Sequence, residues 1–364
     1  MFEQLTQPIS LILLTIIVVL ALALVRMSQR LKNHQRQQLA TREQSQSALT
    51  LSESEDQDKR FLSKADEALR LTQTFQKFVP RQFVEHFAKH GSNTLELGRA
   101  DEDDVAILFC DIRGFTGLSE KMTPQELMKF LNSYFLRMND PIHQNNGFID
   151  KFIGDAIMAL FDHPDGTDQD KAIDAINAAI DLRYALNIYN QHRSNSGYPP
   201  VNIGVGVHFG PVIIGTVGSD DRMDTTVIGD SVNIAYRIES LAPKLGADII
   251  VSAQTLDTVG DPEKYTYRIL DWVRVKGRNT PLEVYEILDH LPEEEQELKL
   301  ATAELINKGI KIRIEKDWDA ALALFQQALV ISPEDPLIIH HMEQCHRARD
   351  ADYSHDWDGA LTLQ

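Results

Sequence analysis

The sequence is poor in cysteine and in basic charge. Among its 364 residues there are two cysteines, Cys110 and Cys345, which are too few and too far apart for a disulfide framework and fit a reducing compartment. The 36 basic residues are outnumbered by 54 acidic ones, giving a formal net charge of −18. A general nucleic-acid binder needs a basic surface to replace phosphate counterions, so no nucleic-acid partner is expected. A nucleotide ligand is not excluded, because metal ions reverse the local field of an acidic pocket.

Charge is missing altogether from residues 9–25, which are apolar apart from two hydroxyl side chains. This run approaches the roughly 20 residues that a helix needs to cross a bilayer. The eight residues before it contain no Lys or Arg, unlike the start of a secretory signal peptide, although a cleaved signal peptide is the competing interpretation. Basic residues follow the run instead, at Arg26, Arg30, Lys32, Arg36 and Arg42.

By the positive-inside rule, these flanks predict a single-pass anchor in the cell membrane, over residues 1–27, with the bulk of the chain in the cytoplasm. The lipid bilayer would then be a partner of residues 9–25. Residues 28–100 are predicted as a polar linker with an amphipathic end. Residues 28–75 lack a regular heptad repeat of apolar residues. Two interpretations of this segment are kept, a solvated tether and a signalling coiled coil. The phenylalanines and valines of 74–87 could pack on the next domain.

Between residues 101 and 289 the pattern predicts alternating strands and helices. A strand over 105–112 precedes a helix over 123–145, which Thr123, Pro124 and Glu126 open with a capping box. Later elements are a strand pair around Gly154-Asp155, a helix at 168–192, two strands within 201–218, a helix ending at Pro243, and strands at 248–252, 267–275 and 282–287. Strand, helix, two strands, helix, strand is the βαββαβ order of a ferredoxin-like α+β fold, with its helices on one sheet face.

Two acidic residues stand where this fold would bring them together. Asp111 ends the first strand, and Asp155 lies in the turn of the strand pair. Neighbouring carboxylates repel unless a cation lies between them, and hard oxygen ligands suit Mg²⁺. Each residue also has an ordinary explanation, because strand ends and turns favour Asp. The glycine loop at 113–117 runs toward the capped helix and would offer backbone N–H groups to a phosphate, a weak signal by itself.

Three motifs occur in this order: FCDIRGFT at 109–116, DKFIGDAIMALF at 150–161 and TTVIGDSVNIAYRIES at 225–240. With this spacing they resemble the class III nucleotidyl cyclase catalytic domain, the family of adenylate and guanylate cyclases. The resemblance covers roughly residues 100–289. It implies that Asp111, Asp155 and the Ile112 carbonyl bind two Mg²⁺ (or Mn²⁺) ions. It also places the triphosphate beside the loop residues Gly114, Phe115 and Thr116.

The resemblance implies roles for five further residues. Lys151 and Thr226 would recognise the purine, Asn233 would orient the ribose and Arg237 would contact the reacting phosphate. Lys276 would reach the triphosphate, less securely because two arginines are close to it. A lysine donor beside a threonine hydroxyl suits the ring nitrogen and amino group of adenine. Guanylate cyclases generally have Glu and Cys at these positions, so the predicted substrate is ATP.

The predicted reaction is the conversion of ATP to 3′,5′-cyclic AMP and pyrophosphate, by two-metal-assisted attack of the ribose 3′-hydroxyl on the α-phosphorus. Because one chain carries both residue sets, the resemblance implies a symmetric homodimer with its sites at the interface. The histidines His143, His163 and His208 lie outside the motifs, so no histidine base is predicted. Alternatives are a guanylate or relaxed-specificity cyclase, and a catalytically silent nucleotide sensor or scaffold.

The C-terminal part is predicted to be an α-helical hairpin at 294–350, followed by a tail at 351–364. Its spacing matches a tetratricopeptide helix pair at Gly309, Ala321, Phe325, Ala328 and Pro333. An unrelated helical hairpin is the alternative. A single unit of this kind cannot bury its own apolar face, so it should dock on another surface, and it would be the part of the chain that binds a protein partner.

Overall fold

A computed structural model describes residues 19–20, 22–39, 62–71, 74, 80, 83, 98, 100–163, 165–219, 221–275, 281–349 and 359–363. The chain divides into two compact units, Met1–Phe78 and Val79–Gln364. In the first unit, residues 22–39 and 62–71 are helical. Within the described ranges no helix combines the length and the apolar character that crossing a membrane requires. Most of the predicted anchor, residues 9–25, lies outside those ranges.

The second unit is built on one sheet, which contains nine strands among the described residues. Its strands are β1 (Ala100–Ile112), β2 (Phe148–Ile153), β3 (Ala156–Phe161), β4 (Ile203–Ser219), β5 (Arg222–Ile228), β6 (Ile249–Ser252), β7 (Tyr267–Val275), β8 (Leu282–Ile287) and β9 (Leu361–Leu363). The strand order is β2-β3-β1-β4-β6-β8-β7-β9, and β5 pairs with β4 outside this path. The predicted mixed α+β class is confirmed.

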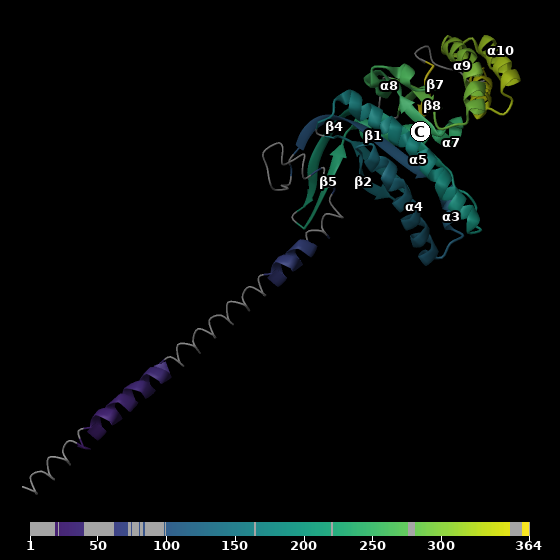
Figure 1. Ribbon diagram of the computed structural model, residues 1–364. Helices are drawn as coiled ribbons and strands as arrows, with labels where there is room; N and C mark the ends of the chain where they lie inside the picture. The colour runs from purple at the N-terminus through teal and green to yellow at the C-terminus, as the bar shows by residue number, and fades with distance from the viewer. Residues whose placement is uncertain are drawn as a thin grey trace, which may run out of the picture. The chain divides into compact units, whose positions relative to one another are not determined.

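Two long helices, α4 (Pro124–Gln144) and α5 (Asp168–Asn195), complete the βαββαβ order with the first four strands. They lie side by side against the sheet in Figure 1. Their apolar side chains share one core with alternate residues of β1, namely Ala106, Leu108, Cys110 and Ile112. Period-two alternation sends the intervening residues of β1 to the opposite face. That second face is therefore open to other elements.

The predicted start of α4 is confirmed. The Thr123 hydroxyl accepts a hydrogen bond from the Glu126 backbone N–H, and the Glu126 carboxylate accepts one from the Thr123 N–H at 2.8 Å. Pro124 occupies the first turn, where its missing N–H costs nothing. The same reciprocal cap, formed by Thr167 and Asp170, opens α5. Both helices begin where the local sequence dictates.

The prediction of two strands within residues 201–218 is wrong, because β4 is one continuous strand of 17 residues. Pro211 suggests an interruption, since proline lacks the N–H that a ladder needs. In the structure β4 pairs with β1 from Ile203 to Gly215, while its other edge pairs with β6 up to Val207 and with β5 from Ile213. Pro211 lies between these two neighbours, so its missing N–H leaves no ladder partner unpaired.

The second face of the sheet carries α6 (Asp230–Glu239). This helix ends before the predicted stop at Pro243, which instead lies in the short helix α7 (Ala242–Leu245). A Cβ atom at Gly206 of β4 would lie 2.4 Å from the Glu239 nitrogen, so glycine there permits the close approach of α6 to the sheet. Phe83 is also buried on this face, 5.3 Å from the Phe148 ring, which confirms packing by the 74–87 segment at this residue.

The C-terminal helices are α9 (Glu293–Ile314), α10 (Trp318–Ile331) and α11 (Pro336–Arg349), so the predicted hairpin has a third helix. Within the pair α9–α10, Gly309 lies directly against the Phe325 ring, as close helix packing requires. Ile306, Ile310 and Leu337 share a core with Leu270 and Val284 of the sheet. The predicted docking is confirmed, and Figure 1 shows α9 and α10 beside β7 and β8. Whether the pair is a tetratricopeptide unit stays a prediction.

Buried ion pairs reinforce this docking. Arg268 on β7 donates to Glu286 at 2.8 Å and to both carboxylate oxygens of Asp335, which precedes α11. Arg313 on α9 donates to Asp271 at 2.5 Å. All five of these acidic and basic side chains are almost fully shielded from water. Residues 361–363 of the tail then add β9 as a strand parallel to β7.

The remaining described helices are α3 (Phe115–Ser119), α8 (Ala253–Val259) and a 3₁₀ turn at Pro262–Lys264. Both cysteines, Cys110 and Cys345, are free and buried.

Candidate active site

The carboxyl groups of Asp111 and Asp155 meet at one end of the sheet. Asp111 is next to last in β1, and its Oδ1 accepts a hydrogen bond of 3.0 Å from the Ile112 backbone N–H. Asp155 follows Gly154, whose φ of +66° makes the tight turn between β2 and β3. Because β3 pairs with β1, the turn brings the Asp155 carboxyl within hydrogen-bond reach of Asp111. The predicted approach of the two acids is confirmed.

This pair carries more negative charge than its surroundings neutralise. Burial, together with the hydrogen bond and negative charge of Asp111, raises the pKa of Asp155 to about 7. One oxygen of Asp155 is buried and has no hydrogen-bond partner within the described residues. Glu239 at the end of α6 lies close enough for its pKa to be raised to about 8, by burial first and by Asp111 second. A cation bound beside these carboxyl groups would neutralise the excess negative charge.

The donor set fits Mg²⁺ or Mn²⁺ rather than a metal cage made of protein alone. Across the described residues, no group of three or more His, Cys, Asp or Glu side chains is placed to hold a metal ion. Mg²⁺ is typically bound by one or two carboxylates together with substrate phosphates and water. Two converging carboxylates, one with an unpartnered oxygen, meet that description.

Lys151 and Thr226, predicted as a pair, are in direct contact. The Lys151 ammonium on β2 donates to the Thr226 hydroxyl on β5 at 2.9 Å. It also contacts Asp224 at 3.5 Å and Asp150 at 3.7 Å. Lys151 and Thr226 are 75 positions apart in the chain, so the fold and not the local sequence creates this pair.

The sheet face on which this pair lies is the face of α6. Lys151 is in register with Met158, which belongs to the core on that face together with Phe109 and Ala235. Asp111 shares the orientation of Phe109, two residues before it in the same strand. The metal-binding candidates and the base-reading candidates therefore project from one side of the sheet, opposite α4 and α5.

Asn233 and Arg237 lie one turn apart on α6, as predicted. Asn233 is exposed and donates to the Gly229 carbonyl at 3.4 Å, whereas Arg237 is half-buried. Tyr236, which directly precedes Arg237 and is exposed by 54 %, packs its ring against Phe109. The exposed side of the helix therefore presents an amide and a guanidinium next to each other.

The loop candidates Gly114, Phe115 and Thr116 open α3 directly after β1. Gly114 and Thr116 are exposed, whereas Phe115 packs partly against the core under α4. Lys276 lies outside the described residues, so its predicted role stays a prediction.

Three acidic residues of the site were not predicted. Asp150 and Asp224 flank the Lys151–Thr226 contact, and Glu239 stands near the carboxyl pair. Asp150 and Glu239 belong to the motifs quoted above, but only their burial beside charged partners reveals them.

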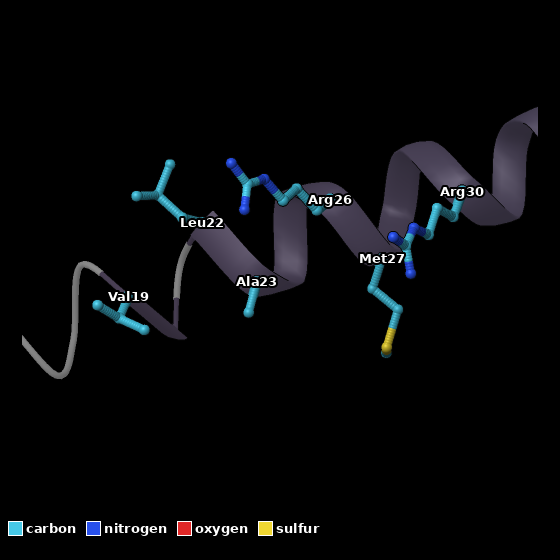
Figure 2. A pocket seen from close by; sticks show the side chains of 6 residues that line it. All are labelled: Val19, Leu22, Ala23, Arg26, Met27 and Arg30. Atoms are coloured by element: carbon cyan, nitrogen blue, oxygen red, sulfur yellow. The ribbon is translucent and has the colours of Figure 1, made fainter.

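A hollow elsewhere in the chain has a different character. Figure 2 shows the side chains that line it on the N-terminal helix, namely Val19, Leu22, Ala23, Arg26, Met27 and Arg30. Its lining is apolar apart from two arginines, with no acid that could bind a metal ion. It is separate from the cyclase motifs.

Residues 98–289, more than half of the chain, match the family described as the adenylate and guanylate cyclase catalytic domain. The chain therefore belongs to this family, which confirms the resemblance seen in its three motifs.

Among individual proteins, an adenylate cyclase of Anabaena cylindrica is 42% identical over 219 residues, covering 59% of this chain and 42% of that protein. The terminal-differentiation-specific adenylate cyclase of Dictyostelium discoideum is 34% identical over 276 residues, 76% of this chain and 13% of its own. The chain spans less than half the length of either relative. A solved bacterial light-regulated adenylyl cyclase is 26% identical, with a TM-score of 0.55, covering 66% of this chain and 68% of that one.

Proposed function

We propose that this protein is an adenylate cyclase, which converts ATP to 3′,5′-cyclic AMP and pyrophosphate. The observation that carries the proposal is the convergence of Asp111 and Asp155 on the sheet face that also bears the Lys151–Thr226 contact. Adenylate cyclases among the relatives support the same activity.

Asp111, Asp155 and the Ile112 carbonyl would hold the divalent cations. Such ions lower the pKa of a bound hydroxyl and neutralise phosphate charge, which is the chemistry they would supply here. The protein's own contribution is to fix two carboxylates in one place. The β1–β3 pairing and the β2–β3 turn do this with backbone geometry, so little is left for substrate to reorganise.

Asn233 and Arg237 would act on the ribose and the phosphate. From adjacent turns of α6, the amide can hold the ribose in position while the guanidinium donates to oxygens of the α-phosphate. Charge develops on these oxygens as the 3′-oxygen attacks, and a charge-assisted hydrogen bond stabilises it more than a neutral one does. Loss of such a donor typically lowers turnover by about 10²- to 10³-fold.

Lys151 and Thr226 would select adenine. Hydrogen bonds to Thr226 and Asp224 use two of the three donors of the ammonium group, which leaves one for the ring nitrogen of the base. The Thr226 oxygen can accept from the exocyclic amine. Guanine presents a carbonyl and an N–H in these places, so both of its contacts would be mismatched.

The active form would be a homodimer with sites at the interface between catalytic domains. Large apolar side chains are 40–54% exposed on β2, β4, β5 and α6: Phe152, Ile153, Ile213, Val217, Met223, Ile228 and Tyr236. Clusters of this kind mark association surfaces. A second copy would cover them and bring its own aspartates to the first copy's Asn233 and Arg237.

Residues 9–25 would anchor the chain in the cell membrane, with the cyclase domain in the cytoplasm. Support comes from the sequence and from the described part of the helix, where exposed Val19 and Leu22 are followed by Arg26 and Arg30 (Figure 2). Basic residues at the cytoplasmic end of a span match the positive-inside rule.

Replacement of Asp155 tests the function directly. Asp155→Asn keeps the size of the side chain and removes its charge, so the purified protein should lose at least about 10²-fold in cyclic AMP formation with Mg²⁺ or Mn²⁺. The matched control is Asp165→Asn, a change in the loop that follows β3 and outside the three motifs. Undiminished product from Asp155→Asn would disprove the metal-binding assignment, and a wild-type protein without product would disprove the activity.

A further inference from the structure

Asp150 is a buried carboxylate for which the reaction described above has no use. Its side chain is fully shielded from water, although it lies on β2 at the edge of the sheet. One of its oxygens has no hydrogen-bond partner within the described residues. A charge kept in such a place costs free energy, so its contacts deserve an explanation.

A β-bulge gives Asp150 its orientation. Ile149 is paired with Ala159 and Lys151 with the preceding residue, Met158, so Asp150 is the extra residue of β2. In a regular strand, neighbouring side chains point to opposite faces. A bulge re-aims them, and here both Asp150 and Lys151 reach Thr226.

The contacts fix the direction of the Thr226 hydroxyl. The Lys151 ammonium, at 2.9 Å, can only donate, so the hydroxyl hydrogen must point elsewhere. The acceptor beside it is Asp150 Oδ2, at 3.4 Å, a long hydrogen bond. Although burial raises the pKa of Asp150 to about 6, the carboxyl is mainly ionised at neutral pH and can only accept.

We propose that Asp150 is a positioning residue for base selection: it holds the Thr226 hydroxyl as an acceptor toward the base. This inference rests on the proposed function. A free threonine hydroxyl can donate or accept, and would therefore tolerate the guanine carbonyl as readily as the adenine amine. With its hydrogen directed at Asp150, the hydroxyl offers only a lone pair, which matches the amine and repels the carbonyl.

Asp150→Asn tests the proposal, because the new amide can donate a hydrogen bond to the Thr226 oxygen. The Thr226 hydroxyl hydrogen would then no longer be directed at residue 150 and could point toward the base. The measurement is the ratio of kcat/KM for ATP to that for GTP in the full-length protein. We expect the ratio to fall about tenfold, the usual worth of one hydrogen bond to a charged group. Asp165→Asn is the matched control: it removes an exposed carboxylate outside the three motifs and should leave the ratio within about twofold.

A double-mutant cycle separates this role from a structural one. Once Thr226→Val has removed the hydroxyl, Asp150→Asn should change the ratio no further. Thermal midpoints show whether each variant is folded. If Asp150→Asn does not fold, Asp150→Ser takes its place, because the serine hydroxyl can also donate a hydrogen bond. An unchanged ratio in a folded variant, or an equal change in the Thr226→Val background, would overturn the proposal.

The equilibrium binding of non-reactive ATP and GTP analogues is measured in parallel with the kinetics, so that base selectivity can be determined even without turnover. A wild type that prefers adenine in binding but forms no product would disprove the proposed activity and leave the Asp150 test intact. A wild type with no adenine preference in either assay would overturn both.

Discussion

At the scale of single residues, the site depends on side chains whose charges are set by their neighbours. Burial and the neighbouring Asp111 raise the pKa of Asp155 to about 7. Lys151 is surrounded by the carboxylates of Asp150 and Asp224 and by the Thr226 hydroxyl. A substitution in such a cluster changes the surroundings of every other member.

Exchange of the base-reading pair illustrates this. Lys151→Glu with Thr226→Cys should move the preference from ATP toward GTP, because an acid and a thiol suit the guanine edge. The new carboxylate would, however, stand beside Asp150 and Asp224, which now contact the Lys151 ammonium within 3.7 Å. Repulsion at this distance favours the protonated acid.

Addition of Asp224→Asn to that double variant should therefore raise GTP turnover several-fold, measured as kcat/KM. Asp224 is the suitable choice because its side chain is 58% exposed and its removal leaves no buried gap. A double variant without any shift toward GTP would argue against the base-reading assignment. A triple variant no better than the double would argue against the repulsion.

Sequence reasoning succeeded for residues whose position follows from strand order, and failed where local geometry intervenes. The approach of Asp111 and Asp155 follows from which strands are neighbours. Asp150 was missed because simple alternation directs it away from Lys151, and a bulge leaves no clear mark in the sequence.

At the scale of elements, the C-terminal helices are held to β7 by charges as well as by apolar packing. Arg268→Met should destabilise the protein by about 3–5 kcal/mol, because Glu286 and Asp335 would remain buried with less compensation. The shift is measured as a change in the urea midpoint of the full chain. Lys299, 2.5 Å from Glu286, would keep part of the charge balance.

Arg347→Met on α11 is the matched control. Arg347 pairs with Glu343 at 3.3 Å, but its side chain is 70% exposed, so solvent screens the interaction. Little change in the urea midpoint is expected. Equal shifts for the two variants would contradict the assigned importance of burial.

The sequence predicted α9 and α10 from their small and aromatic residues, but not how the elements after them contribute. Arg268 and Asp335 are 67 residues apart, and nothing in either local pattern indicates their contact. β4 shows the opposite error: Pro211 suggested a break that the change of neighbouring strands makes unnecessary.

At the scale of the whole molecule, the proposed sharing of each site between two copies can be tested by mixing variants. Asp155→Ala and Arg237→Ala should each be inactive alone. When the two are mixed, half of the dimers are heterodimers with one intact site, so about a quarter of the wild-type activity should return. Cyclic AMP formation after co-expression provides the measurement.

Mixing Asp155→Ala with Asp111→Ala is the matched control. Both changes affect the same residue set, so neither site of the heterodimer would be intact and activity should not return. Recovery in the control, or none in the first mixture despite proven heterodimers, would contradict shared sites.

The family match ends at residue 289, but the folding unit extends further. A chain truncated there would expose Leu270 and Val284 to water and strip Arg268 and Asp271 of acidic and basic neighbours contributed from beyond the cut. Truncations meant to isolate the enzyme should retain everything through α11 and the closing strand. If a shorter chain were inactive, the cause would be a destabilised fold, and the result would say nothing about the catalytic residues.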